Sequence, residues 1–251
     1  VQGSKSRGIY LRQADEVTMK RTFSVEIDPQ LKREDEASEE TQRSKIDLEV
    51  HMMLVSSASW VKAPETLVFG NSGRAFEIEV DPTQLSPGVH SAQITGIPND
   101  GAAGNILFNV PVTITIPLPI QKSVKLGELE FGFAEVKRFF AVPPPGSTWM
   151  DITLTDLRVP STTDGASRMV WLHTVQLLPH AAFRDNECSK HFMLTPGETS
   201  VTSVAVHQGV TCEVALAKYW STRGSTQIEC SIEFRGIRPD PESVNIVAGS
   251  G

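Results

Sequence analysis

The sequence predicts an all-β protein made of two consecutive β-sandwich domains. Apolar residues recur at every second position along several stretches, which is the period of a strand, and no long stretch combines a helical period with helix caps. A length of 251 residues exceeds what one hydrophobic core usually needs, so two domains are expected. A hydrophobic content of 39% and a charged content of 21% are ordinary for a globular chain and exclude collagen and wholesale disorder.

Residues 22–117 are predicted to form an immunoglobulin-like sandwich, preceded by a lead-in from an upstream domain at 1–21. Several short strands separated by turn residues are typical of this fold. Trp60 is a candidate core tryptophan, and Pro111, which has no amide hydrogen, predicts an edge position or a bulge within its strand. The alternating segments are 46–54, 76–80 and 106–116, and turn-forming residues stand at 71–73, 86–88 and 99–101.

The stretch from Lys32 to Lys45 mixes acidic and basic side chains between the first two predicted strands. One interpretation is an acidic docking loop for a basic partner. The other, which the composition favours, is a solvated insertion, because charge-rich segments bury too little apolar area to offset the entropy of ordering.

Residues 124–238 are predicted to form a second antiparallel sandwich with jelly-roll topology, joined to the first by a linker at 118–123. Pro117 and Pro119 stiffen the chain at this boundary and end the long strand before it. Residues 239–251 are predicted to be a C-terminal linker. The alternating segments of this half are 149–155, 170–178, 212–217 and 228–234.

The charge balance and the cysteine content indicate a compartment and exclude some partners. Lysine and arginine total 23 against 30 aspartate and glutamate, a formal net charge of −7, which argues against nucleic acid and against an anionic membrane surface. No apolar run is long enough for a membrane helix, and the polar start from Val1 to Arg7 shows no signal peptide. Three cysteines and no Asn-x-Ser/Thr acceptor suit a reducing setting, so a cytoplasmic location is expected.

The sequence offers no complete catalytic or metal-binding motif, so no catalytic, cofactor-binding or metal-binding residue is assigned. Ser72 and Ser147 lie beside glycines, as nucleophilic serines often do, but neither has the rest of such a motif. Cys188, His191 and His180 supply three ligand-like side chains in a stretch that reads as an exposed loop. Structural zinc requires four ligands, so a chance grouping is favoured.

Aromatic residues of the second half raise the possibility of a carbohydrate site. Sugar-binding sandwiches stack sugar rings on exposed aromatic side chains flanked by polar groups, and Trp149, Trp171, Tyr219 and Trp220 are available. Tryptophans in strands more often anchor cores or interfaces, and this interpretation is favoured.

Short segments spread over nearly the whole chain occur in the same order as in one known family. They are Gly8-Ile9-Tyr10-Leu11-Arg12; Ser59-Trp60-Val61 with Pro64; Val80-Asp81-Pro82 with Leu85, Gly88 and His90; Leu107-Phe108 with Val110-Pro111-Val112-Thr113; Pro145-Gly146 with Thr148-Trp149; Leu172-His173-Thr174-Val175-Gln176-Leu177; Lys218-Tyr219-Trp220-Ser221; and Ile232-Glu233-Phe234 with Gly236-Ile237. On these segments the chain resembles the tripeptidyl peptidase II family. The stretches 32–45 and 161–167 match least, and nothing is inferred for them.

The resemblance implies an immunoglobulin-like sandwich followed by a galactose-binding-like jelly roll. It implies a parent protein that is a cytosolic serine exopeptidase, removing tripeptides from the free N-termini of oligopeptides downstream of the proteasome. The family's catalytic Asp, His, Ser and Asn would lie in a subtilisin-type domain before this segment, so the chain alone is expected not to be an enzyme. The implied partners are the catalytic and C-terminal domains of the same protein, its peptide substrates and further copies in a large homo-oligomer.

Three hypotheses for function remain open. The first is a structural module that braces the protease domain and supplies subunit contacts. The second is a sugar- or peptide-binding module built around Trp149, Trp171 and Trp220. The third is capture of substrate peptide by β-addition to an exposed strand edge, although nothing in the sequence identifies that edge.

Overall fold

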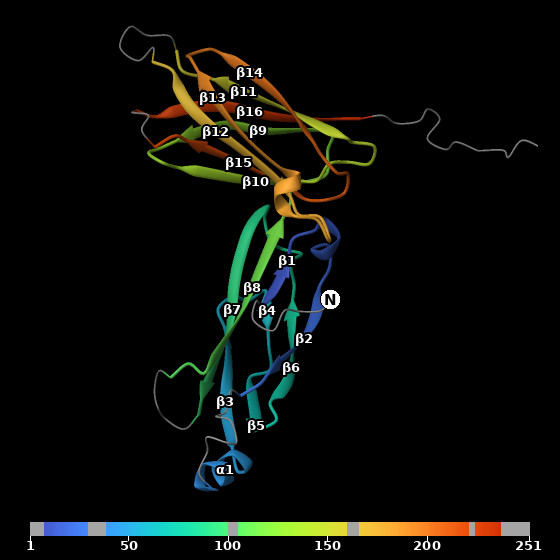
Figure 1. The fold of residues 1–251 in the computed structure, drawn as a ribbon, viewed down its shortest axis with the longest axis vertical. Helices are drawn as coiled ribbons and strands as arrows, with labels where there is room; N and C mark the ends of the chain where they lie inside the picture. The colour runs from blue at the N-terminus through green and yellow to red at the C-terminus, as the bar shows by residue number, and fades with distance from the viewer. Residues whose placement is uncertain (1–7, 30–38, 100–104, 160–165, 221–223, 237–251) are drawn as a thin grey trace, which may run out of the picture. The chain divides into compact units, whose positions relative to one another are not determined.

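The computed structural model divides into two compact units, Val1–Ile116 and Pro117–Gly251, each with its own hydrophobic core (Figure 1). Strands dominate both units, so the all-β prediction is confirmed. None of the helices in the described ranges is long or apolar enough to cross a lipid bilayer. The structure describes residues 8–29, 39–99, 105–159, 166–220 and 224–236.

Within the described ranges, the elements follow one another as short strands with three brief helical segments. In the first unit they are β1 (Ile9–Leu11), the 3-10 helix η1 (Ala14–Glu16), β2 (Arg21–Ile27), α1 (Glu39–Ile46), β3 (Glu49–Ser56), β4 (Val61–Lys62), β5 (Thr66–Gly70), β6 (Arg74–Val80), β7 (Gly88–Pro98) and β8 (Phe108–Ile116). In the second they are β9 (Ser123–Phe131), β10 (Val136–Ala141), β11 (Trp149–Asp156), β12 (Arg168–Gln176), the 3-10 helix η3 (Phe183–Asn186), β13 (Glu187–Leu194), β14 (Thr199–Ala205), β15 (Cys212–Lys218) and β16 (Thr226–Arg235).

The first unit is a sandwich of a five-stranded sheet, β1-β8-β7-β3-β5, and a three-stranded sheet, β2-β6-β4. Strand β6 shows how the predicted alternation builds it. Phe76, Ile78 and Val80 are buried in the core, while Glu77 and Glu79 project from the other face of the strand. Burying each large apolar side chain contributes about 1.5–3 kcal/mol, so the period-two pattern determines which face turns inward.

Strand β1 adds to this sandwich from within the predicted lead-in at 1–21. It pairs in parallel with β8, placing Ile9 opposite Val112 and Leu11 opposite Ile114. Ile9 and Leu11 are buried in the first core. This part of the lead-in is therefore structurally part of the first sandwich, because two apolar residues two positions apart suffice for one buried strand face.

Trp60 occupies a position that agrees with its interpretation, whereas Pro111 does not. Pro111 is paired with Gln93 of β7, and it lies just before the residues of β8 that pair with β1. Strand β8 lies between β1 and β7 and its pairing with β7 runs through Pro111 without a register shift, so the predicted edge position or bulge is wrong; the proline lies where β1 does not pair with β8. Trp60 is half-buried and packs against the first core.

Helix α1 corrects the prediction for the charged stretch 32–45, of which 32–38 lies outside the described residues. We expected no helix and a strand starting at Ile46, whereas Ile46 ends α1 and is 73% exposed. The helix has no apolar face, so hydrophobic periodicity could not reveal it. The helix is stabilised instead by charges that interact favourably with its dipole, namely the acidic Glu39 and Glu40 in the first turn and basic residues in the last turn.

The second unit is a sandwich of two four-stranded antiparallel sheets, β10-β15-β12-β13 and β14-β11-β16-β9. Its core contains the inward residues of both sheets, including Ile152 and Leu154 from β11 and Leu172 from β12, all fully buried. The predicted antiparallel second sandwich is confirmed. At the predicted linker, Leu118 packs against this core and its N–H donates a hydrogen bond to the Phe140 carbonyl, 2.7 Å away.

Strand β13 corrects a second prediction. The stretch around Cys188 and His191 was expected to be an exposed loop, but both residues lie on this strand, which pairs with β12 at the edge of its sheet. Most of its side chains are exposed or half-exposed. An edge strand with polar residues on both faces shows little alternation, so its sequence resembles a loop.

Candidate functional site

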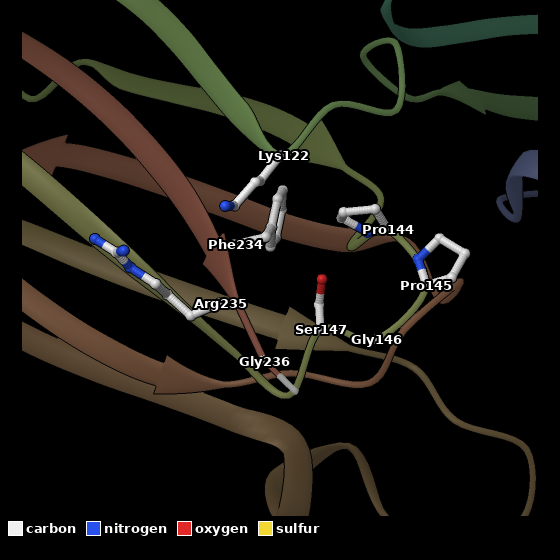
Figure 2. A pocket seen from close by; sticks show the side chains of 8 residues that line it. All are labelled: Lys122, Pro144, Pro145, Gly146, Ser147, Phe234, Arg235 and Gly236. Atoms are coloured by element: carbon white, nitrogen blue, oxygen red, sulfur yellow. The ribbon is translucent and has the colours of Figure 1, made fainter. Parts of the chain in front are cut away.

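A pocket of about 250 Å³ lies in the second sandwich where three chain segments meet (Figure 2). One segment precedes β9, the second is the loop between β10 and β11, and the third is the end of β16. The lining residues are Lys122, Pro144, Pro145, Gly146, Ser147, Phe234, Arg235 and Gly236. These segments are far apart in the sequence, so strand pairing rather than a local motif assembles the pocket.

Close backbone contact shapes the pocket. A Cβ atom at Gly236 would lie only 1.8 Å from the Gly146 carbonyl oxygen, so position 236 accepts only glycine without a shift of the backbone. Gly146 has a φ of +84°, which glycine tolerates best. The Phe234 N–H donates to the Lys122 carbonyl at 2.8 Å and so holds the first segment against the end of β16.

The polar side chains of the pocket differ in whether they already form hydrogen bonds or ion pairs with other protein groups. Ser147 is 7% exposed, and Figure 2 shows its Oγ directed into the pocket; no hydrogen bond joins this hydroxyl to another described residue. Lys122 is exposed at the rim and forms no ion pair within the described ranges. Arg235, by contrast, donates to Asp151 Oδ2 at 3.0 Å and to Glu233 Oε2 at 2.8 Å.

Asp151 is held in its ionised form by the same surface network. Ser203 Oγ donates to Asp151 Oδ1 at 2.6 Å, and this hydrogen bond is the main reason that the pKa of Asp151 lies below its ordinary value; Arg235 lowers it further. The guanidinium charge of Arg235 is therefore matched by carboxylates. Lys122 is therefore the cationic side chain of the lining that has no described carboxylate partner and could pair with a ligand.

Neither candidate serine has the geometry of a nucleophile. The lining of the pocket around Ser147 contains no histidine and no carboxylate, so the partners of a Ser-His-Asp grouping are absent from it. Ser72 lies exposed in the turn between β5 and β6 of the first sandwich. In the part of the chain that the structure describes, neither serine hydrogen-bonds to a histidine.

The structure separates the candidate metal ligands. Cys188 and His191 are three positions apart on β13, so their side chains leave opposite faces of the strand. His180 lies outside the strand, before η3. Among the described residues, no three His, Cys, Asp or Glu side chains gather as metal ligands.

The tryptophans of the second unit do not lie in its core, so of the two favoured roles, core anchor and interface anchor, the core role is excluded. Trp149 is 39% exposed, Trp171 is 40% exposed and Trp220 is 62% exposed. Trp149 alternates with the buried residues of β11 and Trp171 with those of β12, so the two rings lie on opposite outer faces of the sandwich. They cannot form one stacking platform for a sugar.

Two of these aromatic side chains are already engaged by neighbours. The Trp171 ring lies 4.8 Å from the His191 ring, and its indole N–H donates to Ser189 Oγ at 2.5 Å. Trp220 lies 5.8 Å from Tyr219. Local packing therefore accounts for the part of each ring that is covered.

A buried charged cluster in the second unit was not predicted from the sequence. The Asp156 carboxylate is fully buried and accepts hydrogen bonds from Arg158, the shortest at 2.6 Å. Arg168 and Lys218 are also buried, and burial is the main reason that the pKa of Lys218 lies below its ordinary value, with Arg168 and Arg158 adding to it. Charged residues at strand ends usually face solvent, so no sequence signal distinguishes these four.

Comparison with known proteins identifies both sandwiches. Residues 1–115 match the family model described as the first Ig-like domain of tripeptidyl-peptidase II, and residues 131–224 match the model described as its galactose-binding domain-like region. Together these models cover most of the chain. The chain belongs to the tripeptidyl-peptidase II family.

Relatives of this family extend the match over the full segment. Tripeptidyl-peptidase 2 of Drosophila melanogaster is 28% identical over 100% of this chain, and that of Arabidopsis thaliana is 28% identical over 95%. A crystal structure of tripeptidyl peptidase 2 superimposes with a TM-score of 0.81 at 27% identity, covering 92% of this chain. The chain spans only 17–19% of the length of these proteins.

The matches place the chain in a defined, non-catalytic part of the family. They correspond to the Ig-like and galactose-binding-like regions of tripeptidyl-peptidase II and not to its protease domain. The predicted fold class, an immunoglobulin-like sandwich followed by a galactose-binding-like sandwich, is therefore confirmed. The predicted family is confirmed with it.

Proposed function

We propose that this chain is a structural and assembly segment of a cytoplasmic tripeptidyl-peptidase II-like enzyme. The parent protein would be a serine peptidase that removes tripeptides from the N-termini of oligopeptides downstream of the proteasome. The segment would bind the catalytic and C-terminal domains of the same polypeptide and contribute to contacts within a homo-oligomer. The names of the relatives support this assignment.

The outer face of the five-stranded sheet carries this proposal. Met53 and Val55 on β3 and Val68 on β5 point away from the core and are 48%, 46% and 42% exposed. Val68 pairs with the residue two positions before Met53, so the side chains are diagonal neighbours on one surface. We call Met53, Val55 and Val68 the apolar stripe.

The other sheet of the same sandwich provides the internal comparison. Its outward positions carry Thr22, Ser24 and Glu26 on β2 and Glu77 on β6, all exposed and polar. A sandwich that met water on both faces would be polar on both. Clustered apolar side chains on one face alone are typical of a surface that another protein domain covers.

The test uses the full-length peptidase that contains this segment. The double variant Met53→Glu/Val68→Glu places two charges in the apolar stripe, and the matched control Ser24→Glu places one on the polar sheet. We expect the double variant to lower the molar mass of the assembly in light scattering, or the thermal midpoint of the protein, while the control changes neither. Unchanged mass and unchanged midpoint in the double variant would refute the proposed contact.

A further inference from the structure

We propose that the pocket around Ser147 binds a carboxylate that is attached to a small apolar group. The proposal concerns the second sandwich alone and does not depend on the assembly role proposed above. It rests on the hydrogen-bonding inventory of the pocket, on its charge and on its size.

Neighbouring groups already occupy several of the hydrogen-bonding groups of the pocket, but not the Ser147 hydroxyl. The Ser147 N–H is occupied by the Pro144 carbonyl at 3.1 Å, and the Gly146 N–H by Gln208 Oε1 at 2.5 Å. The carbonyls of Lys122 and Arg235 accept hydrogen bonds from backbone N–H groups. The Ser147 hydroxyl has no such partner among the described residues, and a hydroxyl that opens into a pocket is satisfied by a ligand or by solvent.

The charge of the pocket points to an anion. Its lining contains two cationic side chains and no carboxylate. Arg235 is matched by Asp151 and Glu233, whereas the Lys122 ammonium has no described counter-ion. A ligand oxygen that reached both Ser147 Oγ and Lys122 Nζ would gain charge-assisted hydrogen bonds. Two donors suit a carboxylate, while phosphate sites generally supply more donors, often from arginine.

The size and walls of the pocket limit the rest of the ligand. About 250 Å³ is below the ~300–1,000 Å³ of most clefts for drug-sized ligands, so the pocket holds one residue rather than an extended peptide or an oligosaccharide. Pro144, Pro145 and Phe234 are the apolar residues of the lining; Pro144 and Phe234 are buried, so Pro145 supplies most of the exposed apolar wall. The C-terminal residue of a peptide and a free short-chain organic acid share the required chemistry.

The experiment follows the amide resonances of the ¹⁵N-labelled 251-residue chain during titration. The probes are the peptide Ala-Ala-Leu with a free carboxylate, the same peptide as its C-terminal amide, and 4-methylpentanoate as the free organic acid. We expect both acids to shift the resonances of Gly146, Ser147 and Gly236, and the amide to bind at least about fivefold more weakly, because it lacks the charge. Tighter binding of the peptide acid than of 4-methylpentanoate would identify a peptide end as the ligand, and equal binding would identify the small acid.

Variants test the two donors separately. Ser147→Ala should weaken binding of the acids by about tenfold, as expected for a hydrogen bond to a charged group. Lys122→Met should weaken it by about threefold, because an exposed ammonium is partly screened. Lys125→Met is the matched control, since Lys125 is exposed on β9 outside the lining and should change nothing. Equal binding of acid and amide, no shift at the pocket, or full affinity in both Ser147→Ala and Lys122→Met would overturn the proposal.

Discussion

Replacing Asp156 by asparagine tests whether its buried carboxylate stabilises the second sandwich. The side chain of Asp156 is completely buried, and that of Arg158, its ion-pair partner, is 9% exposed. Besides the guanidinium, the Arg158 N–H donates to Asp156 Oδ1 at 3.0 Å. Asparagine has nearly the same shape but no charge, so the substitution leaves the buried Arg158 guanidinium without this counter-charge.

The expected cost follows from the burial of the cluster. Removing one partner of a buried ion pair typically destabilises a protein by about 3–5 kcal/mol, because the remaining charge is left in a poorly solvated place. For a unit of this size, that corresponds to a fall of about 12–20 °C in the thermal midpoint. Asp151→Asn is the matched control: Asp151 is 21% exposed and ion-paired on the surface, and it should cost about 1 kcal/mol or less.

Differential scanning calorimetry of the whole chain measures both variants. The two units have separate cores, so the transition of the second unit should move in Asp156→Asn while that of the first stays in place. If Asp156→Asn lowers the stability of the second unit no more than Asp151→Asn does, the buried carboxylate stabilises it no more than a surface one, and the reasoning is refuted.

Three further predictions concern the same sandwich. Gly236→Ala should destabilise it by about 1–3 kcal/mol in urea unfolding, because its Cβ would meet the Gly146 carbonyl oxygen, while Gly132→Ala, whose Cβ would have no contact closer than 3.5 Å, should be nearly neutral; equal effects would contradict this. Ser203→Ala should raise the pKa of Asp151 in an NMR titration. Because folding lowers this pKa, the Asp151 carboxylate stabilises the folded state at pH values above its unfolded-state pKa of about 3.9, and this stabilisation is lost as the pH falls through its folded-state pKa. Burial raises the pKa of the Cys230 thiol to about 12, and Cys212 is only 1% exposed. The half-buried Cys188 should therefore react first with a thiol reagent at pH 8. Simultaneous reaction of all three cysteines would contradict the buried placement of Cys212 and Cys230.

The strands that could be predicted are those with one solvent-exposed face and one buried face. Strand β6 alternates strictly because Ile78 is fully buried while its neighbour Glu77 is exposed, and β16 does the same around Ile232. Strand β13 and helix α1 could not be predicted, because an edge strand with polar residues on both faces and a helix without an apolar face carry no periodic signal.

The pocket could not be predicted for a different reason. Ser147 drew attention as a serine beside a glycine, but Lys122 and Gly236 lie in segments that come together only through the pairing of β16 with its neighbours. Burial of a polar group is likewise a property of the packed sandwich. Nothing local to Asp156 or to Lys218 separates these buried residues from the many exposed charges of the chain.

Oxidation of Met53 gives the most direct test of the proposal that this chain supplies contacts within a larger peptidase. Met53 is 48% exposed at the centre of the apolar stripe, while the adjacent Met52 is fully buried and serves as the internal reference. In the isolated chain, peroxide should oxidise Met53 far faster than Met52, as mass spectrometry of the resulting peptides would show. In the full-length protein, we predict that Met53 becomes protected toward the level of Met52. An equal rate of Met53 oxidation in the isolated chain and in the full-length protein would contradict the proposal.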